Sequence, residues 1–146
     1  MQPRAVALGQ HLIEVHRWLR EQLDAIHADA TAFGEGRGVR ATDLRTHCLT
    51  FCSILEHHHT GEDQQLFPFL AGQHPELGSV FEELMRDHGQ VAEILNRITE
   101  LVRNLSAQPA PDEVARMRTE LDGLAALLEN HLNYEEKKLV PILDAL

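Results

Sequence analysis

The sequence predicts an all-α fold, an antiparallel up-down four-helix bundle built from two repeated helical hairpins. Apolar residues recur at intervals of three and four in four segments, and no segment alternates polar and apolar residues as a half-buried strand would. Short breaks that contain Gly or Pro separate these segments, which favours neighbouring helices that run in opposite directions. A chain of 146 residues is long enough for one hydrophobic core. We therefore expect a single domain over residues 1–146.

The four helices are expected at about residues 4–30, 42–66, 76–105 and 111–139. The breaks between them read FGEGRGVRATD, LFPFLAGQHPELGS and LSAQPAPDE. The fourth helix should begin at Pro111, where proline loses no helical hydrogen bond, and acids follow it where the helix dipole favours them. The apolar stripes, helix by helix, are Leu12, Ile13, Leu19, Leu23 and Ile26; Leu44, Cys48, Phe51 and Leu55; Phe81, Leu84, Val91, Leu95, Ile98 and Val102; and Leu121, Leu124 and Leu128.

The second half of the chain repeats the first. EVHRWLREQLDAI aligns with RDHGQVAEILNRI on His16 and His88, which are 72 residues apart. EHHHTGEDQQLFPFL aligns with LENHLNYEEKKLVPIL on His58 and His131, which are 73 residues apart, and both segments carry acids four and five residues after the histidine. Because the two separations agree, we expect two hairpins of one kind that each contribute the same residues.

Two His–Glu pairs project onto the predicted core face. His58 and Glu62 are four residues apart, which places them about 40° from each other around a helix. His131 and Glu135 form the same pair in the fourth helix. Burying two carboxylates without partners costs several kcal/mol, and a bound cation would offset that cost.

His16 and His88 lie on the apolar faces of the first and third helices, so all four helices direct polar residues toward one core. A single histidine on such a face is usually a hydrogen-bonded core residue, but four of them beside two carboxylates predict a metal site. Imidazole and carboxylate ligands suit iron, and they are also compatible with manganese or zinc.

The lone His followed by His-x-x-x-Glu, repeated once with EDQQLFP and EEKKLVP around the acids, resembles the hemerythrin family, in the branch called HHE cation-binding domains. The likeness extends from about Gln10 to Ile142. It implies a centre of two non-haem Fe ions joined by an oxo or hydroxo bridge, with both glutamates bridging the ions. The ligands that the resemblance implies are His16, His58, Glu62, His88, His131 and Glu135.

The three consecutive histidines differ in helical phase. His58 lies on the core face, His57 should be solvated about 100° away, and His59 lies at the edge on the other side. The oxygen-carrying members of the resembled family have a fifth histidine four residues from the third-helix histidine, where this chain has Leu84 and Ala92. His59 is therefore a candidate for an extra ligand or for a hydrogen-bond partner of a ligand.

Three polar neighbours of the motif, Glu136, Arg20 and Asp63, have more than one interpretation. The resembled family uses an acid five residues after the fourth-helix histidine, but Glu136 projects about 140° from His131, so Glu135 is preferred. Arg20 is expected to pair with a surface acid, to pair with a bridging glutamate or to gate the pocket. Asp63 is expected beside a ligand or in solvent.

Composition excludes some partners. With 13 basic and 23 acidic residues the net charge is −10, which disfavours nucleic acid and acidic membranes. No apolar run approaches the roughly 20 residues that span a bilayer, and the first residues lack a secretion signal, so a cytoplasmic protein is expected. Cys48 and Cys52 should be buried thiols, and a monomer or a weak homodimer is expected.

The leading functional hypothesis is a di-iron protein that handles a small oxidant. It would bind or sense O2 or NO, or decompose H2O2 in a catalase-like reaction, and the sequence leaves this choice open. Without a fifth imidazole both irons would keep open positions, which favours peroxide chemistry over dedicated O2 carriage. The alternative is a non-catalytic iron-binding module for iron sensing or storage, and a metal-free helical adaptor is a third hypothesis.

Overall fold

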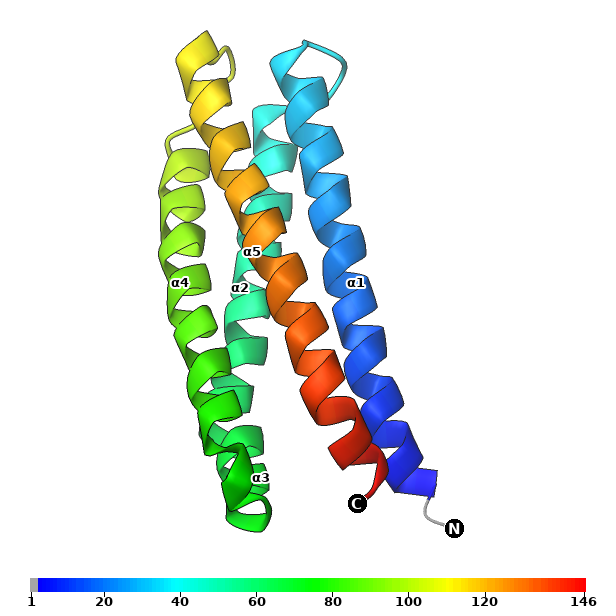
Figure 1. The fold of residues 1–146 in the computed structure, drawn as a ribbon. Coiled ribbons are helices and arrows are strands. Elements are labelled where there is room, and N and C mark those ends of the chain that lie inside the picture. Colours follow the sequence, from blue (N-terminus) through cyan, green and yellow to red (C-terminus); the bar gives the residue numbers. More distant parts are fainter. Residues whose placement is uncertain (1–2) are drawn as a thin grey trace.

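Four long helices form a bundle in the computed structural model, which describes residues 3–146 and the side chains from Leu8 onward. α1 packs against α2 and α5, and α4 packs against the same two helices (Figure 1). The start of α1 and the end of α5 lie at one end of the bundle, and the α1–α2 and α4–α5 connections lie at the other (Figure 1). The long helices are α1 (Pro3–Gly34), α2 (Ala41–Gly61), α4 (Gly78–Arg103) and α5 (Pro111–Asp144).

The connections at that other end follow their residue types. Gly36 and Gly38 turn the chain between α1 and α2 with φ of 70° and 82°, a conformation that a Cβ atom disfavours. α5 begins at Pro111 with Asp112 and Glu113 in its first turn, as predicted.

The sequence indicated that the second helical segment ends near residue 66, but in the structure the segment continues beyond that residue. It continues through a π-helical turn, η1 (Glu62–Leu66), into α3 (Phe67–Gln73), and the 3₁₀ turn η2 (Pro75–Leu77) then leads to α4. The Phe67 N–H donates to the Glu62 carbonyl five residues earlier. Proline in a regular helix clashes with the carbonyl four residues before it, and the wider turn just before Pro68 lets the helix continue.

The other helix ends also differ from the expected ones. α1 extends to Gly34 instead of ending near residue 30, and α4 is slightly shorter than residues 76–105. α5 passes through Pro141 and ends at Asp144, beyond the expected end at 139. Pro141 deprives only the carbonyl four residues earlier of its N–H partner, and Lys137 at that position is exposed to water.

Two apolar clusters fill the bundle, and a layer of buried polar side chains separates them. Leu19, Val91 and Leu128 belong to the larger cluster, whereas Leu12 and Leu84 belong to the smaller one around Phe67. Full burial of a leucine side chain contributes about 1.5–3 kcal/mol, so the two clusters hold the helices firmly on both sides of the polar layer. The buried polar residues are His16, His59, Glu62, His88, His131 and Glu135.

Cys48 and Cys52 lie in the larger cluster as free thiols, as predicted. Burial raises the pKa of Cys48 to about 12 and that of Cys52 to about 11. Both thiols therefore stay protonated and pack as small apolar groups. None of the described helices combines the length and hydropathy that crossing a bilayer requires.

Candidate metal centre

Seven polar side chains from four long helices and the π-helical turn meet in the polar layer. The structure brings together all six residues that the sequence singled out as ligands, and it adds His59. The widened turn η1 carries Glu62, and such π-turns are frequent at functional sites. α1 supplies His16, α2 supplies His58 and His59, α4 supplies His88, and α5 supplies His131 and Glu135.

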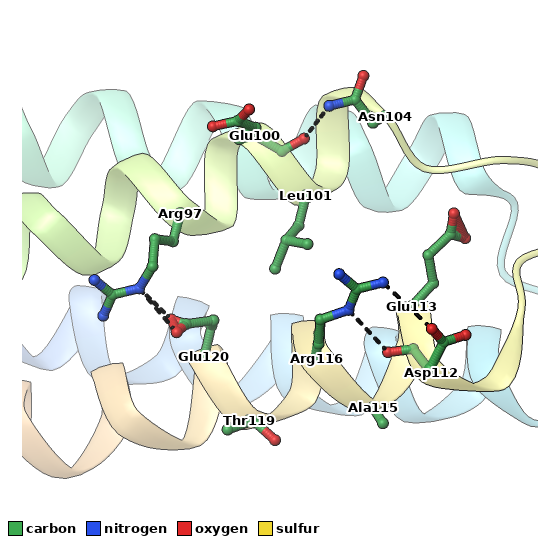
Figure 2. Close-up of a pocket in the computed structure, with 10 residues that line it drawn as sticks. All are labelled: Arg97, Glu100, Leu101, Asn104, Asp112, Glu113, Ala115, Arg116, Thr119 and Glu120. Atoms are coloured by element: carbon green, nitrogen blue, oxygen red, sulfur yellow. Dashed lines mark hydrogen bonds and ion pairs between the residues drawn. The ribbon is translucent and has the colours of Figure 1, made fainter.

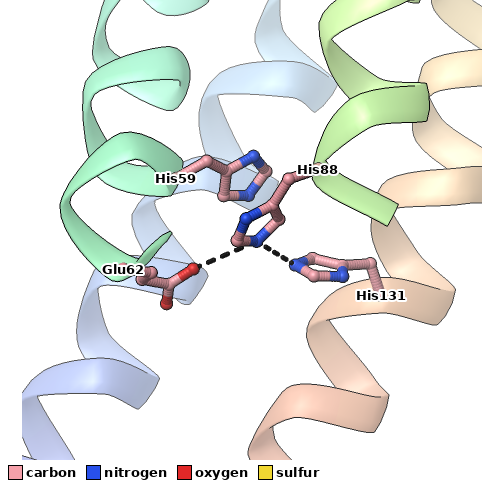
Figure 3. A group of neighbouring side chains, drawn as sticks. All are labelled: His59, Glu62, His88 and His131. Atoms are coloured by element: carbon pink, nitrogen blue, oxygen red, sulfur yellow. Dashed lines mark hydrogen bonds and ion pairs between the residues drawn. The ribbon is translucent and has the colours of Figure 1, made fainter. Parts of the chain in front are cut away.

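The ligand atoms of these residues form two groups, and within each group all atoms lie within 4.8 Å of one another. Two ligands of one ion, each about 2.1 Å from it, lie up to about 4.2 Å apart, so each group has nearly the dimensions of one ion's coordination sphere. Glu62 belongs to both groups, which places the two candidate positions side by side. The first group is His59, Glu62, His88 and His131 (Figure 3), and the second is His16, His58, Glu62 and Glu135.

Most of these ligand atoms lack a hydrogen-bond partner. His16 Nε2 lies 3.0 Å from Glu135 Oε1, but the contact lacks hydrogen-bond geometry. A buried polar atom without a partner costs about 1–3 kcal/mol, and a charged one costs more. One cation in each group would satisfy every unpartnered atom, so the residues present fit a pair of metal ions. These atoms are Nε2 of His16, His58 and His59 and both carboxylate oxygens of Glu62 and Glu135.

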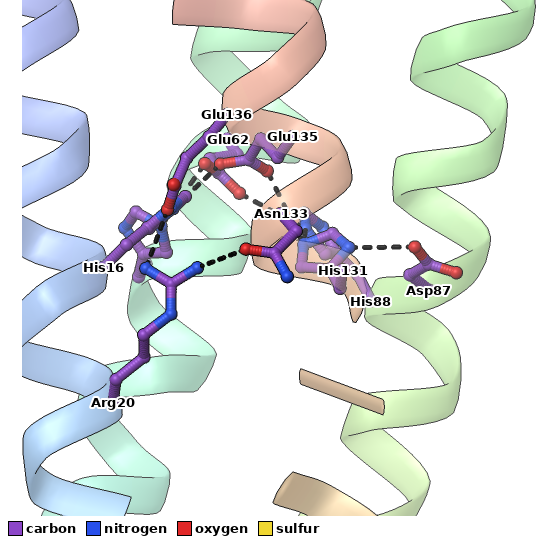
Figure 4. Close-up of polar contacts among 10 residues, drawn as sticks. His16, Arg20, Glu62, Asp87, His88, His131, Asn133, Glu135 and Glu136 are labelled. Carbon is purple, nitrogen blue, oxygen red and sulfur yellow. Dashed lines mark hydrogen bonds and ion pairs between the residues drawn. The ribbon is translucent and has the colours of Figure 1, made fainter. Parts of the chain in front are cut away.

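Three of the histidines donate the N–H of their other ring nitrogen to a carboxylate, and Figure 4 shows two of these contacts, those of His16 and His131. Because a carboxylate can only accept, the proton of each ring lies on Nδ1 and the lone pair of Nε2 is left for the centre. Histidines that bind metals are usually oriented in this way. The contacts are His88 to Asp63 at 2.7 Å, His131 to Asp87 at 2.9 Å and His16 to Glu136 at 2.7 Å.

Arg20 supports one of these carboxylates. It donates to Glu136 at 2.9 Å, and also to Glu129 and Asn133 (Figure 4). Arg20 therefore does not pair with a bridging glutamate, which was one of its three expected roles. It fixes the acid that accepts the Nδ1–H bond of His16.

A profile of the hemerythrin HHE cation binding domain matches residues 8–143, nearly the whole chain. The chain belongs to the hemerythrin HHE family. This confirms the resemblance that the doubled His-x-x-x-Glu motif indicated. No curated protein and no solved structure matches the chain.

The carboxylates that accept the Nδ1–H bonds in this HHE domain include two that sequence reasoning did not identify, Glu136 and Asp87. A signal for Glu136 exists in the repeat, because Asp63 and Glu136 are both five residues after the motif histidine. Each of these two acids bonds the lone histidine of the other hairpin. Asp87 has no such signal, since its counterpart 72 residues earlier is Val15.

The two halves of the HHE domain differ at the centre. His59 corresponds to Leu132 in the repeat, so the first hairpin has an extra imidazole, and Asp87 corresponds to Val15, so the second hairpin has an extra supporting carboxylate. The group with His88 therefore contains three histidines, whereas the group with His16 contains two.

His59 lies inside the HHE centre, although its helical phase placed it at an edge. Its side chain is 5% exposed, and its ring stacks on that of His88 with centroids 3.8 Å apart. Burial and the neighbouring His88 lower the pKa of His59 to about 2, so the ring stays neutral, as a metal ligand must. His57 is exposed, as predicted.

The remaining pKa shifts follow from burial and from the charges and hydrogen bonds of neighbouring side chains. Burial lowers the pKa of His16 to about 4, and it lowers that of His131. Burial and the charge of Glu62 raise the pKa of Glu135 well above its usual range. Burial alone would raise the pKa of Glu62, but the contacts with His58 and His88 outweigh it and lower that pKa.

We predict that the metal-free HHE domain loses stability as the pH falls from 7 to 5. His16, His59 and His131 have depressed pKa values when folded, so the unfolded chain takes up three more protons on them near its ordinary histidine pKa. Glu135 has a raised pKa when folded, so on this residue the folded chain binds more protons than the unfolded chain, which partly offsets the loss. The net loss should approach about 1.4 kcal/mol per pH unit for each uncompensated proton.

Urea unfolding of the metal-free protein at a series of pH values would measure this loss. His59→Leu should make the dependence on pH shallower, because it removes one of the three histidines. Equal stability at pH 7 and pH 5 would contradict the prediction.

Proposed function

We propose that this HHE domain binds two non-haem iron ions and through them handles a small oxidant. The observation that carries the proposal is the pair of ligand groups that share the buried, unpartnered carboxylate of Glu62. One ion would take His59, His88 and His131, and the other would take His16 and His58. Glu62 would lie between them and Glu135 on the side of His16 and His58, with an oxo or hydroxo group as a further bridge.

Iron is the metal that this set favours. Imidazole nitrogen and carboxylate oxygen form a mixed ligand set of intermediate softness, and no thiolate is near, since both cysteines lie in the apolar cluster. When bound, iron supplies Lewis-acid and redox chemistry toward O2, NO or H2O2.

The difference between the two ligand groups favours reversible binding of O2 or NO over decomposition of H2O2. The sequence-based preference for peroxide chemistry depended on a missing fifth imidazole, and His59, which groups with His88 and His131, would supply one. With three imidazoles in one ligand group and two in the other, an ion held by His16 and His58 would have more room for a small ligand than its neighbour.

The protein's own residues hold the protons of the site in place. Asp63, Asp87 and Glu136 keep the Nδ1 protons of three histidines, so these rings cannot turn their N–H groups toward the centre. A metal ion would therefore meet lone pairs and carboxylates that are already oriented, so that its binding would need little reorganisation of the protein.

The test is the iron content and absorption spectrum of the aerobically purified protein, followed by three additions. Two irons per chain and a reversible spectral change with O2 or NO after reduction are expected. Rapid O2 evolution from added H2O2, without a reversible adduct, would favour the catalase-like alternative. A protein that takes up no iron would contradict the proposal.

His59→Leu should weaken one iron position selectively, because it places in the first hairpin the residue that the second hairpin has at Leu132. We expect iron retention during dialysis against a chelator to fall at least about tenfold for one of two ions. His57→Leu is the matched control, since His57 is exposed one residue away, and it should leave both ions in place. Equal retention in the two variants would show that His59 is no ligand.

A further inference from the structure

A groove between α1 and the α2–α3 segment leads from the surface to the proposed centre. Its volume is about 590 Å³. Phe69 and Leu8 at its surface are about half exposed, whereas Glu62 within it is buried, so the groove deepens toward the metal ligands. Its apolar walls include Leu8, Leu12, Val15, Leu66 and Phe69.

The groove reaches the centre at the ligand group that has fewer histidines. His58 lines it and is 18% exposed, the largest exposure among the seven grouped side chains, and the other six are 5% exposed or less. Val15, which also lines the groove, stands where the other half has Asp87. The ligand group that lacks the third imidazole and the support of Asp87 is thus the group that opens to the surface.

The charge of this groove differs from that of the other surface grooves. The larger groove between α4 and α5 is lined by four acids and two arginines, which are largely paired with one another (Figure 2). A smaller one beside His59 contains Glu56 and Asp63. Among the described residues that line the groove at His58, the one carboxyl is the buried Glu62, and the polar rim consists of His11, His57 and Gln65. An anionic group can approach here without meeting an exposed acid, in a chain of net charge −10.

The size of the groove exceeds what a diatomic ligand needs. A water molecule occupies about 30 Å³ of liquid, and sites for organic ligands span about 300–1,000 Å³ with largely apolar walls. We propose that the groove binds an organic molecule with an apolar body and one terminal carboxylate, whose oxygen reaches the open iron position beside His58. This inference rests on the proposed di-iron centre and assigns to it a second, larger class of ligand.

Calorimetric titration of the oxidised, iron-loaded protein with octanoate and acetate tests the inference. Octanoate should bind at least tenfold more tightly than acetate, because its alkyl chain would be removed from water. Both should displace azide, a small anion whose binding is followed by the absorption of the iron centre. The double variant Leu8→Ser with Phe69→Ser should abolish the advantage of octanoate and leave iron content and azide binding unchanged. Ile54→Ser is the control, since Ile54 is exposed at 40% but does not line the groove.

Three outcomes would overturn the inference while leaving the proposed function intact. Octanoate could bind no more tightly than acetate, it could bind without displacing azide, or the groove variant could keep the advantage of octanoate. If sedimentation shows a dimer that the double variant dissociates, the groove is a contact between two copies of the chain instead. A protein without iron would overturn the proposed function itself, and iron content is measured on the same samples.

Discussion

Glu62→Gln should remove both iron ions from the protein. Glu62 is the one residue that belongs to both ligand groups, and both of its carboxylate oxygens lack a hydrogen-bond partner. An amide of the same shape has one neutral acceptor oxygen and an NH2 group that cannot bind a cation. Iron per chain, measured by elemental analysis after gel filtration, should fall from two to fewer than about 0.2, if loss of the shared ligand weakens each ion at least about a hundredfold.

Two further variants make this result specific to Glu62. Glu135→Gln should cost mainly the ion beside His16 and His58, because Glu135 is grouped with them and not with His59. His57→Ala should leave two irons, because His57 is exposed. Retention of both ions in Glu62→Gln would show that the shared carboxylate does not hold the metals.

Removal of the metal should lower the melting temperature by more than about 10 °C. A ligand present at 1,000 times its Kd stabilises the folded state by about 4 kcal/mol, and each kcal/mol corresponds to about 2–4 °C in a domain of this size. The loss has a structural origin, because the empty centre leaves unpartnered carboxylates and imidazoles between two apolar clusters. Scanning calorimetry before and after chelation would measure it.

The variant Glu135→Gln tests whether the loss of stability comes from the empty centre and not from the chelator itself. In the metal-free state it removes the repulsion between Glu135 and Glu62, the second cause of the raised pKa of Glu135 after burial. The metal-free variant should therefore melt higher than the metal-free parent, although it binds iron less well. Equal melting temperatures with and without metal in the parent protein would contradict both expectations.

The helix ends show where sequence reasoning stopped. Gly and Pro indicated the breaks, and Pro111 did mark the start of α5. Pro68 and Pro141 did not end their helices, because Pro68 follows a π-helical turn and the carbonyl that Pro141 displaces belongs to the exposed Lys137. A proline ends a helix only when the displaced carbonyl finds no other arrangement, and that depends on the local backbone geometry.

The carboxylates that orient the histidines show a second limit. Asp63 and Glu136 occupy equivalent places in the repeat, yet helical phase alone directed Glu136 away from its own pair. It bonds His16 on another helix, 120 residues earlier in the chain. The angle between two side chains of one helix says nothing about a third side chain that approaches from a neighbouring helix.

The spacing of apolar residues and the doubled His-x-x-x-Glu motif were enough to indicate the helical fold, the family and the six residues that meet at the centre. These properties are periodic within single helices, and a residue and its fourth successor share a face wherever the helix is placed. The role of His59 was decided only by the tertiary structure. Helical phase placed His59 at the edge of the core face. In the structure α4 packs beside α2 and the His88 ring stacks on that of His59, so this edge is buried. The open side at His58 was decided in the same way, because burial depends on which helices are neighbours, and the sequence of one helix does not contain that information.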